Sequence, residues 1–224
     1  ELYVQPLSGG QEVRLTEENT RLEEEYQYSA VEYLPFLNSN GVEIQGWYLK
    51  PVNFKQGEKY PAILFIHGGP QCAFGTIFNH DMQLAAARGF GVLFCNPTGS
   101  EGRGGDFGDL RMKYGTIDYD DLVGFTKYAV EQLPWIDGKN LGVTGGSYGG
   151  IMTNWIIGHT DLFQAAVSDR GVSNNISDFG LSDIGVSFGL DTFETTPWGD
   201  IGFLWDQSPL KYAGNIKTPT LFIH

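Results

Sequence analysis

The residues with the clearest capacity for chemistry form one run, G-G-S-Y-G-G, from Gly145 to Gly150. This run contains the pattern G-x-S-x-G, with an apolar strand-like segment before it and an apolar helix-like segment after it. Glycine neighbours allow a tight, strained turn that lifts a serine hydroxyl above a sheet, and the following helix directs free N–H groups at negative charge. The pattern predicts Ser147 as a nucleophile for acyl transfer; the alternative is a structural serine in a glycine-rich turn.

A second motif, His67-Gly68-Gly69-Pro70, follows directly after another apolar run. A loop in this place can supply one backbone N–H of an oxyanion hole, while the residue after the nucleophile supplies the other. We therefore expect Gly69 and Tyr148 to donate to the oxyanion from roughly 2.7–3.1 Å. We interpret His67 as a structural residue of this loop and not as a catalytic base.

Alternating strand-like and helix-like segments surround both motifs. Continuous apolar runs predict buried strands, whereas the segment 42–49 alternates as a half-exposed strand does. The expected strands are 42–49, 62–66, 91–95, 141–144, 165–168 and 220–223, and the expected helices are 81–88, 118–132 and 148–157. This order predicts an α/β fold, a mostly parallel sheet with helices on both faces.

Composition excludes several classes of function. The 224 residues carry a net charge of −13, which disfavours a nucleic-acid partner, and no apolar run is long enough to span a membrane. Cys72 and Cys95 are too few for a disulfide framework or a zinc site, so we expect free thiols and a reducing, cytoplasmic compartment. We expect no metal and no organic cofactor.

Two acidic groups invite other interpretations. Asp118, Asp120 and Asp121 lie where a helix is expected to begin, and carboxylates in a first turn are favoured by the helix dipole. We prefer this structural interpretation to a metal site. The run Glu23-Glu24-Glu25 is interpreted as part of a solvated linker, not as a site for an amine or a cation.

With these motifs in place, the chain resembles the prolyl oligopeptidase family, in particular its acylaminoacyl-peptidase and dipeptidyl-peptidase-like branch. The resemblance rests on residues 41–47, 60–70, 96–97, 99–100, 141–155, 208–210 and 218–221. It implies an α/β-hydrolase fold and a serine peptidase that cleaves short peptides. It further implies that residues 1–28 are the end of a β-propeller blade plus a linker, and that residues 29–224 are the catalytic domain.

The same resemblance implies that the catalytic acid and histidine lie beyond residue 224. His159 is expected at the far end of the helix after Ser147, and His224 matches the family's histidine before the acid loop. We therefore expect a chain truncated at its C-terminus and inactive alone. A carboxylesterase or lipase on the same fold, and a non-catalytic fragment that self-associates as a homo-oligomer through an uncovered sheet edge, remain alternatives.

The segment 169–205 is rich in glycine, aromatic residues and aspartate and follows a predicted strand. Such an insertion often lies over the active site of this fold. Candidate residues for an apolar substrate pocket are Val172, Ile176, Phe179 and Trp205, although core packing explains apolar side chains there equally well.

Overall fold

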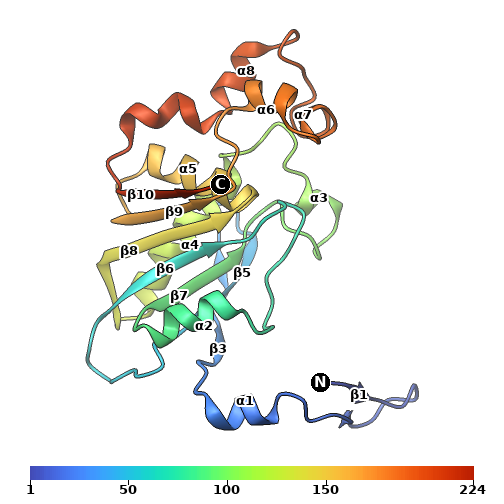
Figure 1. Cartoon of the computed structure of the whole chain (residues 1–224), viewed down its shortest axis with the longest axis vertical. Coiled ribbons are helices and arrows are strands. Elements are labelled where there is room, and N and C mark those ends of the chain that lie inside the picture. The colour runs from blue at the N-terminus through green and yellow to red at the C-terminus, as the bar shows by residue number, and fades with distance from the viewer.

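The computed structural model describes residues 1–224, apart from the side chain of Glu23. Its main sheet contains eight strands: β3 (Val31–Tyr33), β4 (Phe36–Leu37), β5 (Glu43–Leu49), β6 (Tyr60–Ile66), β7 (Gly91–Asn96), β8 (Ile136–Gly146), β9 (Ala165–Asp169) and β10 (Thr220–Ile223). Their order is β10-β9-β8-β6-β7-β5-β3, with β4 paired to β5. The strands from β10 to β7 run parallel, and β5 and β3 add antiparallel pairs at one side (Figure 1). The expected mostly parallel sheet is confirmed.

Helices cover both faces of this sheet because its central strands are apolar at successive positions. On β7, Val92 and Phe94 pack on the side of helix α2 (His80–Ala87). Leu93 and Cys95 point to the opposite face, where they join the core formed with α4 (Ile117–Gln132) and α5 (Tyr148–His159). Every residue of α5 except His159 is buried. The part of the chain that the structure describes has no helix with the length and apolarity that a bilayer crossing demands.

The insertion between β9 and β10 is helical. It contains α6 (Asn175–Leu181), α7 (Gly185–Phe193), α8 (Ile201–Asp206) and the 3-10 helix η1 (Pro209–Asn215). The side chains of Asn174 and Asp200 accept N–H groups in the first turns of α6 and α8, as good helix caps do. Figure 1 shows α6, α7 and α8 gathered beyond the carboxyl ends of the strands, and a short helix α3 (Gly105–Gly108) follows β7 on the same side of the molecule.

The first residues form a small unit of their own. Strands β1 (Tyr3–Val4) and β2 (Val13–Arg14) pair antiparallel, and α1 (Thr20–Glu25) occupies the glutamate-rich stretch that we expected to be a linker. Figure 1 shows β1 and α1 lying away from the main sheet. Both strands are only two residues long and fully exposed.

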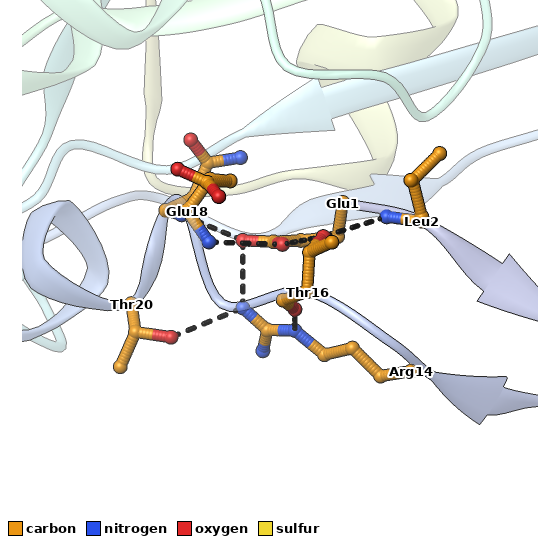
Figure 2. A network of polar contacts seen from close by, with 7 residues as sticks. Glu1, Leu2, Arg14, Thr16, Glu18 and Thr20 are labelled. Carbon is orange, nitrogen blue, oxygen red and sulfur yellow. Dashed lines mark hydrogen bonds and ion pairs between the residues drawn. The ribbon is translucent and has the colours of Figure 1, made fainter.

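A carboxylate holds this unit together. The Glu1 side chain accepts hydrogen bonds from Thr16 Oγ1 at 2.5 Å, from the Asn19 N–H at 2.6 Å and from Arg14 Nη2 at 2.8 Å (Figure 2). These bonds, the Thr16 hydroxyl first among them, lower the pKa of Glu1 to about 2. One side chain thus ties the hairpin to the segment that leads into α1.

Candidate active site

Ser147 lies at the junction of β8 and α5, on the carboxyl edge of the sheet. Its backbone adopts φ 58° and ψ −120°, a combination that L residues rarely adopt, and its side chain is exposed. The Ser147 N–H donates to the Asp169 carbonyl of β9 at 3.0 Å, which fixes the strained turn to the neighbouring strand. Among the described residues, the Ser147 side chain makes no capping hydrogen bond to α5, so its hydroxyl is available for chemistry.

The residues around Ser147 must be glycines because the backbones of α5, β6 and β9 lie too close together here to leave room for a Cβ atom. A Cβ at Gly149 would lie 2.3 Å from the Ile66 carbonyl oxygen, and one at Gly145 would lie 2.6 Å from Gly149 backbone atoms. A Cβ at Gly150 would come within 2.6 Å of the Asp169 carbonyl oxygen. Helix α5 therefore starts in direct contact with β6 and β9, and this contact raises Ser147 above the sheet edge.

The loop after β6 passes next to the serine. A Cβ built on Gly68 would lie 3.6 Å from the Ser147 Cβ, and Gly69 has a φ of 116° that favours glycine. The first N–H groups of a helix have no partner within it, so the Tyr148 N–H at the start of α5 is free of intrahelical bonding. The structure thus brings both predicted oxyanion segments to Ser147.

His67 is engaged by the loops around it. Its Nε2 lies 2.9 Å from Ser100 Oγ and its Nδ1 lies 2.6 Å from the Gly68 carbonyl oxygen. The side chain is buried, and this burial lowers its pKa and favours the neutral imidazole. These contacts agree with a structural role in the loop, and Ser100 is a partner that the sequence did not indicate.

The side chain of Tyr148 points into the core. Its hydroxyl donates to Asp118 Oδ2 at 2.7 Å, and both side chains are almost completely buried. Burial raises the pKa of Asp118 to about 6, while the hydrogen bonds from Tyr148 and from backbone N–H groups oppose that rise. Sequence reasoning explained Asp118 by the helix dipole and missed this contact.

The other buried aspartate at the start of α4 holds a loop. Asp121 Oδ2 accepts from the N–H and the hydroxyl of Thr98 at 2.8 and 2.7 Å, and its Oδ1 accepts from Asn38 Nδ2 at 2.8 Å. Within the described part of the chain, no group of three or more His, Cys, Asp or Glu side chains is placed to hold a metal ion. The two buried aspartates of α4, Asp118 and Asp121, therefore have structural partners.

An ion pair flanks the serine on its other side. Asp169 ends β9 and contacts Arg170, with 2.8 Å between Oδ2 and Nη2. A Cβ on Gly146 would lie 3.0 Å from Arg170 Nη2, so the guanidinium lies beside the turn that carries Ser147. Arg170 has a φ of 50°, and its N–H donates to the Ile223 carbonyl at 2.8 Å.

Both histidines that follow Ser147 lie where the sequence indicated. His159 ends α5, where its ring stacks on Trp155 with 4.3 Å between centroids and its Nδ1 lies 2.7 Å from the Trp155 carbonyl oxygen. His224 follows β10 and lines a groove with Val172 and Phe222. Neither arrangement supplies a hydrogen bond to Ser147 among the described residues.

The four candidate pocket residues lie in different surroundings. Val172 lines the groove at the ends of β9 and β10, whereas Ile176 packs against the main core. Phe179 is buried and contacts Trp198 edge to face at 5.8 Å, and Trp205 is partly exposed on α8. Of the four, only Val172 lines this groove, which lies just after β9. The substrate pocket stays a prediction.

Comparison with known proteins places this geometry in a family. The model of the prolyl oligopeptidase family matches residues 76–224, which is more than half of the chain. The chain belongs to the prolyl oligopeptidase family. It is 45% identical over 225 residues to the uncharacterized peptidase YuxL of Bacillus subtilis strain 168. The aligned region covers 100% of this chain and 34% of that protein.

Two solved structures are also similar to this chain in fold. The acylaminoacyl peptidase of Pyrococcus horikoshii superposes with a TM-score of 0.91 at 35% identity, over 96% of this chain and 35% of that one. An acylaminoacyl peptidase in complex with Z-Gly-Gly-Phe-chloromethyl ketone gives a TM-score of 0.91 at 36% identity, with the same coverage of 96% and 35%. The chain thus spans about a third of the length of these relatives.

Proposed function

We propose that this chain carries the nucleophile and the oxyanion hole of a serine peptidase that hydrolyses short peptides through an acyl-enzyme. Ser147 attacks the scissile carbonyl, and the N–H groups of Gly69 and Tyr148 donate hydrogen bonds to the oxyanion of the tetrahedral intermediate. The observation that carries the proposal is an exposed, strained Ser147 with the Gly68-Gly69 loop packed beside it. Membership of the prolyl oligopeptidase family supports a peptide substrate, as does the complex of a related acylaminoacyl peptidase with Z-Gly-Gly-Phe-chloromethyl ketone.

We place the general base and its acid outside residues 1–224. His67 is occupied by Ser100 and the Gly68 carbonyl, and His159 lies at the far end of α5. A serine without its base is a weak nucleophile, and loss of the histidine can cost about a millionfold in kcat, as in the subtilisin case.

The first test is reaction of Ser147 with a fluorophosphonate, followed by intact mass. We expect the full-length protein to be labelled stoichiometrically and to cleave peptide anilides, and Ser147→Ala to lose both activities. The 224-residue chain, folded by circular dichroism, should be labelled slower by orders of magnitude because it lacks a base. Equal labelling of both forms would mean that the base lies within these residues.

The specific alternative is a carboxylesterase or lipase, because the same serine and oxyanion hole serve any acyl transfer. Comparing the full-length protein on peptide anilides and on simple esters decides between them. Efficient ester turnover without peptide cleavage would overturn the peptidase assignment.

We also propose the division of the chain, its compartment and its assembly. Residues 1–28 would end a β-propeller blade and lead into the catalytic domain at residues 29–224, supported by the separate β1–β2 unit. Two free thiols, exposed Cys72 and buried Cys95, support a reducing, cytoplasmic compartment. The outer edge of β10, with exposed Leu221 beside it, supports self-association into a homo-oligomer.

A further inference from the structure

The hydroxyl of Tyr148 is bonded to the carboxylate of Asp118, whose orientation is itself fixed by further hydrogen bonds. Asp118 is completely buried, and its Oδ1 accepts the N–H groups of Thr116 at 2.9 Å and Tyr119 at 3.0 Å. Its Oδ2 is left to accept the Tyr148 hydroxyl at 2.7 Å. The carboxylate is therefore fixed by the first turn of α4 and presents one oxygen to α5.

The ring of Tyr148 touches both sides of the site. It lies 6.4 Å from the His67 ring at the start of the oxyanion loop, and it meets the Tyr114 ring edge to face at 5.5 Å. Tyr114 in turn contacts Phe193 of α7 at 5.7 Å. The tyrosine thus wedges between the loop that carries Gly69 and the segment that leads into α4.

In the proposed function, the part of Tyr148 that contacts the substrate is its backbone N–H, which donates a hydrogen bond to the oxyanion. Ser147 occupies a strained conformation, and the peptide between Ser147 and Tyr148 determines where the Tyr148 N–H points. A side chain anchored by a buried hydrogen bond restricts rotation of that peptide. Oxyanion donors act through such preorganisation, because they must already point to the position that the negative charge will occupy.

We propose that Asp118 is a positioning residue for acyl transfer: by holding the Tyr148 hydroxyl it fixes the peptide whose N–H donates to the oxyanion. This inference rests on the proposed role of Ser147 as the nucleophile. Asp118 does not touch the substrate; it acts through Tyr148. Burial of the Asp118 carboxylate costs free energy, and an apolar pair of side chains at this contact would be at least as stable. Stability alone therefore does not explain the carboxylate.

The test uses four variants of the full-length protein: Tyr148→Phe, Asp118→Asn, their double variant, and Thr126→Val as a control. Thr126 is a buried polar residue of the same helix whose hydroxyl bonds locally to the Leu122 carbonyl, away from Tyr148. For each variant we would measure the melting temperature, kcat and KM on a peptide anilide, and the rate constant for phosphonylation of Ser147.

We expect Tyr148→Phe and Asp118→Asn each to lower kcat and the phosphonylation rate by about tenfold, less than the loss of a whole oxyanion donor, with KM unchanged. The double variant should be no slower than the slower single variant, because both substitutions break the same contact. Thr126→Val should change the melting temperature alone. Unchanged rates in folded Tyr148→Phe and Asp118→Asn would overturn the proposal and leave the pair a purely structural one.

The two readouts separate this inference from the function on which it rests. A wild-type protein that is phosphonylated at Ser147 but cleaves no peptide would remove the peptidase assignment, while its phosphonylation rates would still decide the role of Asp118. A wild-type protein with no reactive Ser147 would overturn both.

Discussion

At the scale of single residues, the site depends on where side chains are absent as much as on where they are present. The hydroxyl of Ser147 is exposed because Gly149 allows the start of α5 to touch the Ile66 carbonyl of β6. Any Cβ at Gly149 would push the helix away from the strand and move the serine with it. The same turn has its only long side chain, that of Tyr148, directed into the core.

The titration of Asp118 should appear in the stability of the protein. Burial raises its pKa from 3.8 to about 6, so the folded state binds a proton in this range that the unfolded state has released. The contribution of Asp118 to stability is therefore largest below about pH 4 and falls as the pH rises through about 6, by roughly 3 kcal/mol at most.

Thermal melting of the wild type and Asp118→Asn across this pH range checks the prediction. The melting temperature of the wild type should fall relative to that of the variant as the pH rises from about 4 to about 7. Other buried acids, such as Asp121, titrate in both proteins and largely cancel in the difference. A difference that does not change with pH would contradict the assignment.

At the scale of elements, the buried strands and the helices around Ser147 were predictable because their apolar patterns are local. Strand β8 was predicted at 141–144 but runs from Ile136 to Gly146. Its first residues, D-G-K-N after Ile136, read as a turn, yet Ile136 pairs with Tyr60 across a register shift that no local pattern reveals. Pairing with a distant strand decided the length of this element.

The helices of the insertion were missed for a related reason. Helix α7 contains Gly185 and Gly189, which have low helix propensity. A Cβ at Gly185 would lie 2.1 Å from the Asp178 carbonyl oxygen, and one at Gly189 would lie 3.0 Å from the Phe179 ring. Close packing against α6 therefore selects glycine here, and tertiary contact overrides the local preference.

The candidate site likewise contains features that local sequence motifs indicate and a contact that they do not. Ser147 and the Gly69 loop could be predicted as site residues from the sequence because each motif is contiguous and lies at a strand end. The Tyr148–Asp118 hydrogen bond joins residues thirty positions apart, and the local explanation for an acidic first turn concealed it. Contacts between separate elements could not be derived from either segment alone.

The outer edge of β10 gives a prediction at this scale. Its residues Leu221, Phe222 and Ile223 are each about half exposed or more, and β10 is the last strand in the order of the described sheet. An apolar edge strand favours pairing with another chain, and charge on the edge opposes it. We expect the 224-residue chain to self-associate in sedimentation velocity and Leu221→Lys to shift it toward the monomer; a wild-type chain that stays monomeric would contradict this.

At the scale of the whole molecule, we propose that the chain divides near residue 29. The Ser29 N–H and hydroxyl bond to Gln83 and to the Lys50 carbonyl, so the main body is anchored from this residue onward. The residues before it are mostly exposed and are held chiefly among themselves by Glu1, although the Tyr28 ring also meets Phe78 of the main body edge to face at 5.4 Å. We therefore expect removal of residues 1–28 to lower the melting temperature of the remainder only slightly, through loss of the Tyr28–Phe78 contact.

Calorimetry of two deletions checks this division. Removing residues 1–33 also deletes β3, whose residues pair with β5 from Val31 to Tyr33, and should lower the melting temperature clearly. Equal destabilisation by both deletions would mean that the N-terminal unit packs as part of the main body.

The strand order has a consequence for how the protein is made. Strand β6 pairs with β7 on one side and with β8 on the other, but β8 begins at Ile136, long after β6 has ended at Ile66. At about 5–20 residues per second, a ribosome needs roughly 4–14 s to synthesise the chain between them. Both edges of the nascent β6 are open until β7 is complete at Asn96, and one edge stays open until β8 is made. The demand for chaperones should therefore be concentrated in that interval, before β8, β9 and β10 add outward in the order of their synthesis.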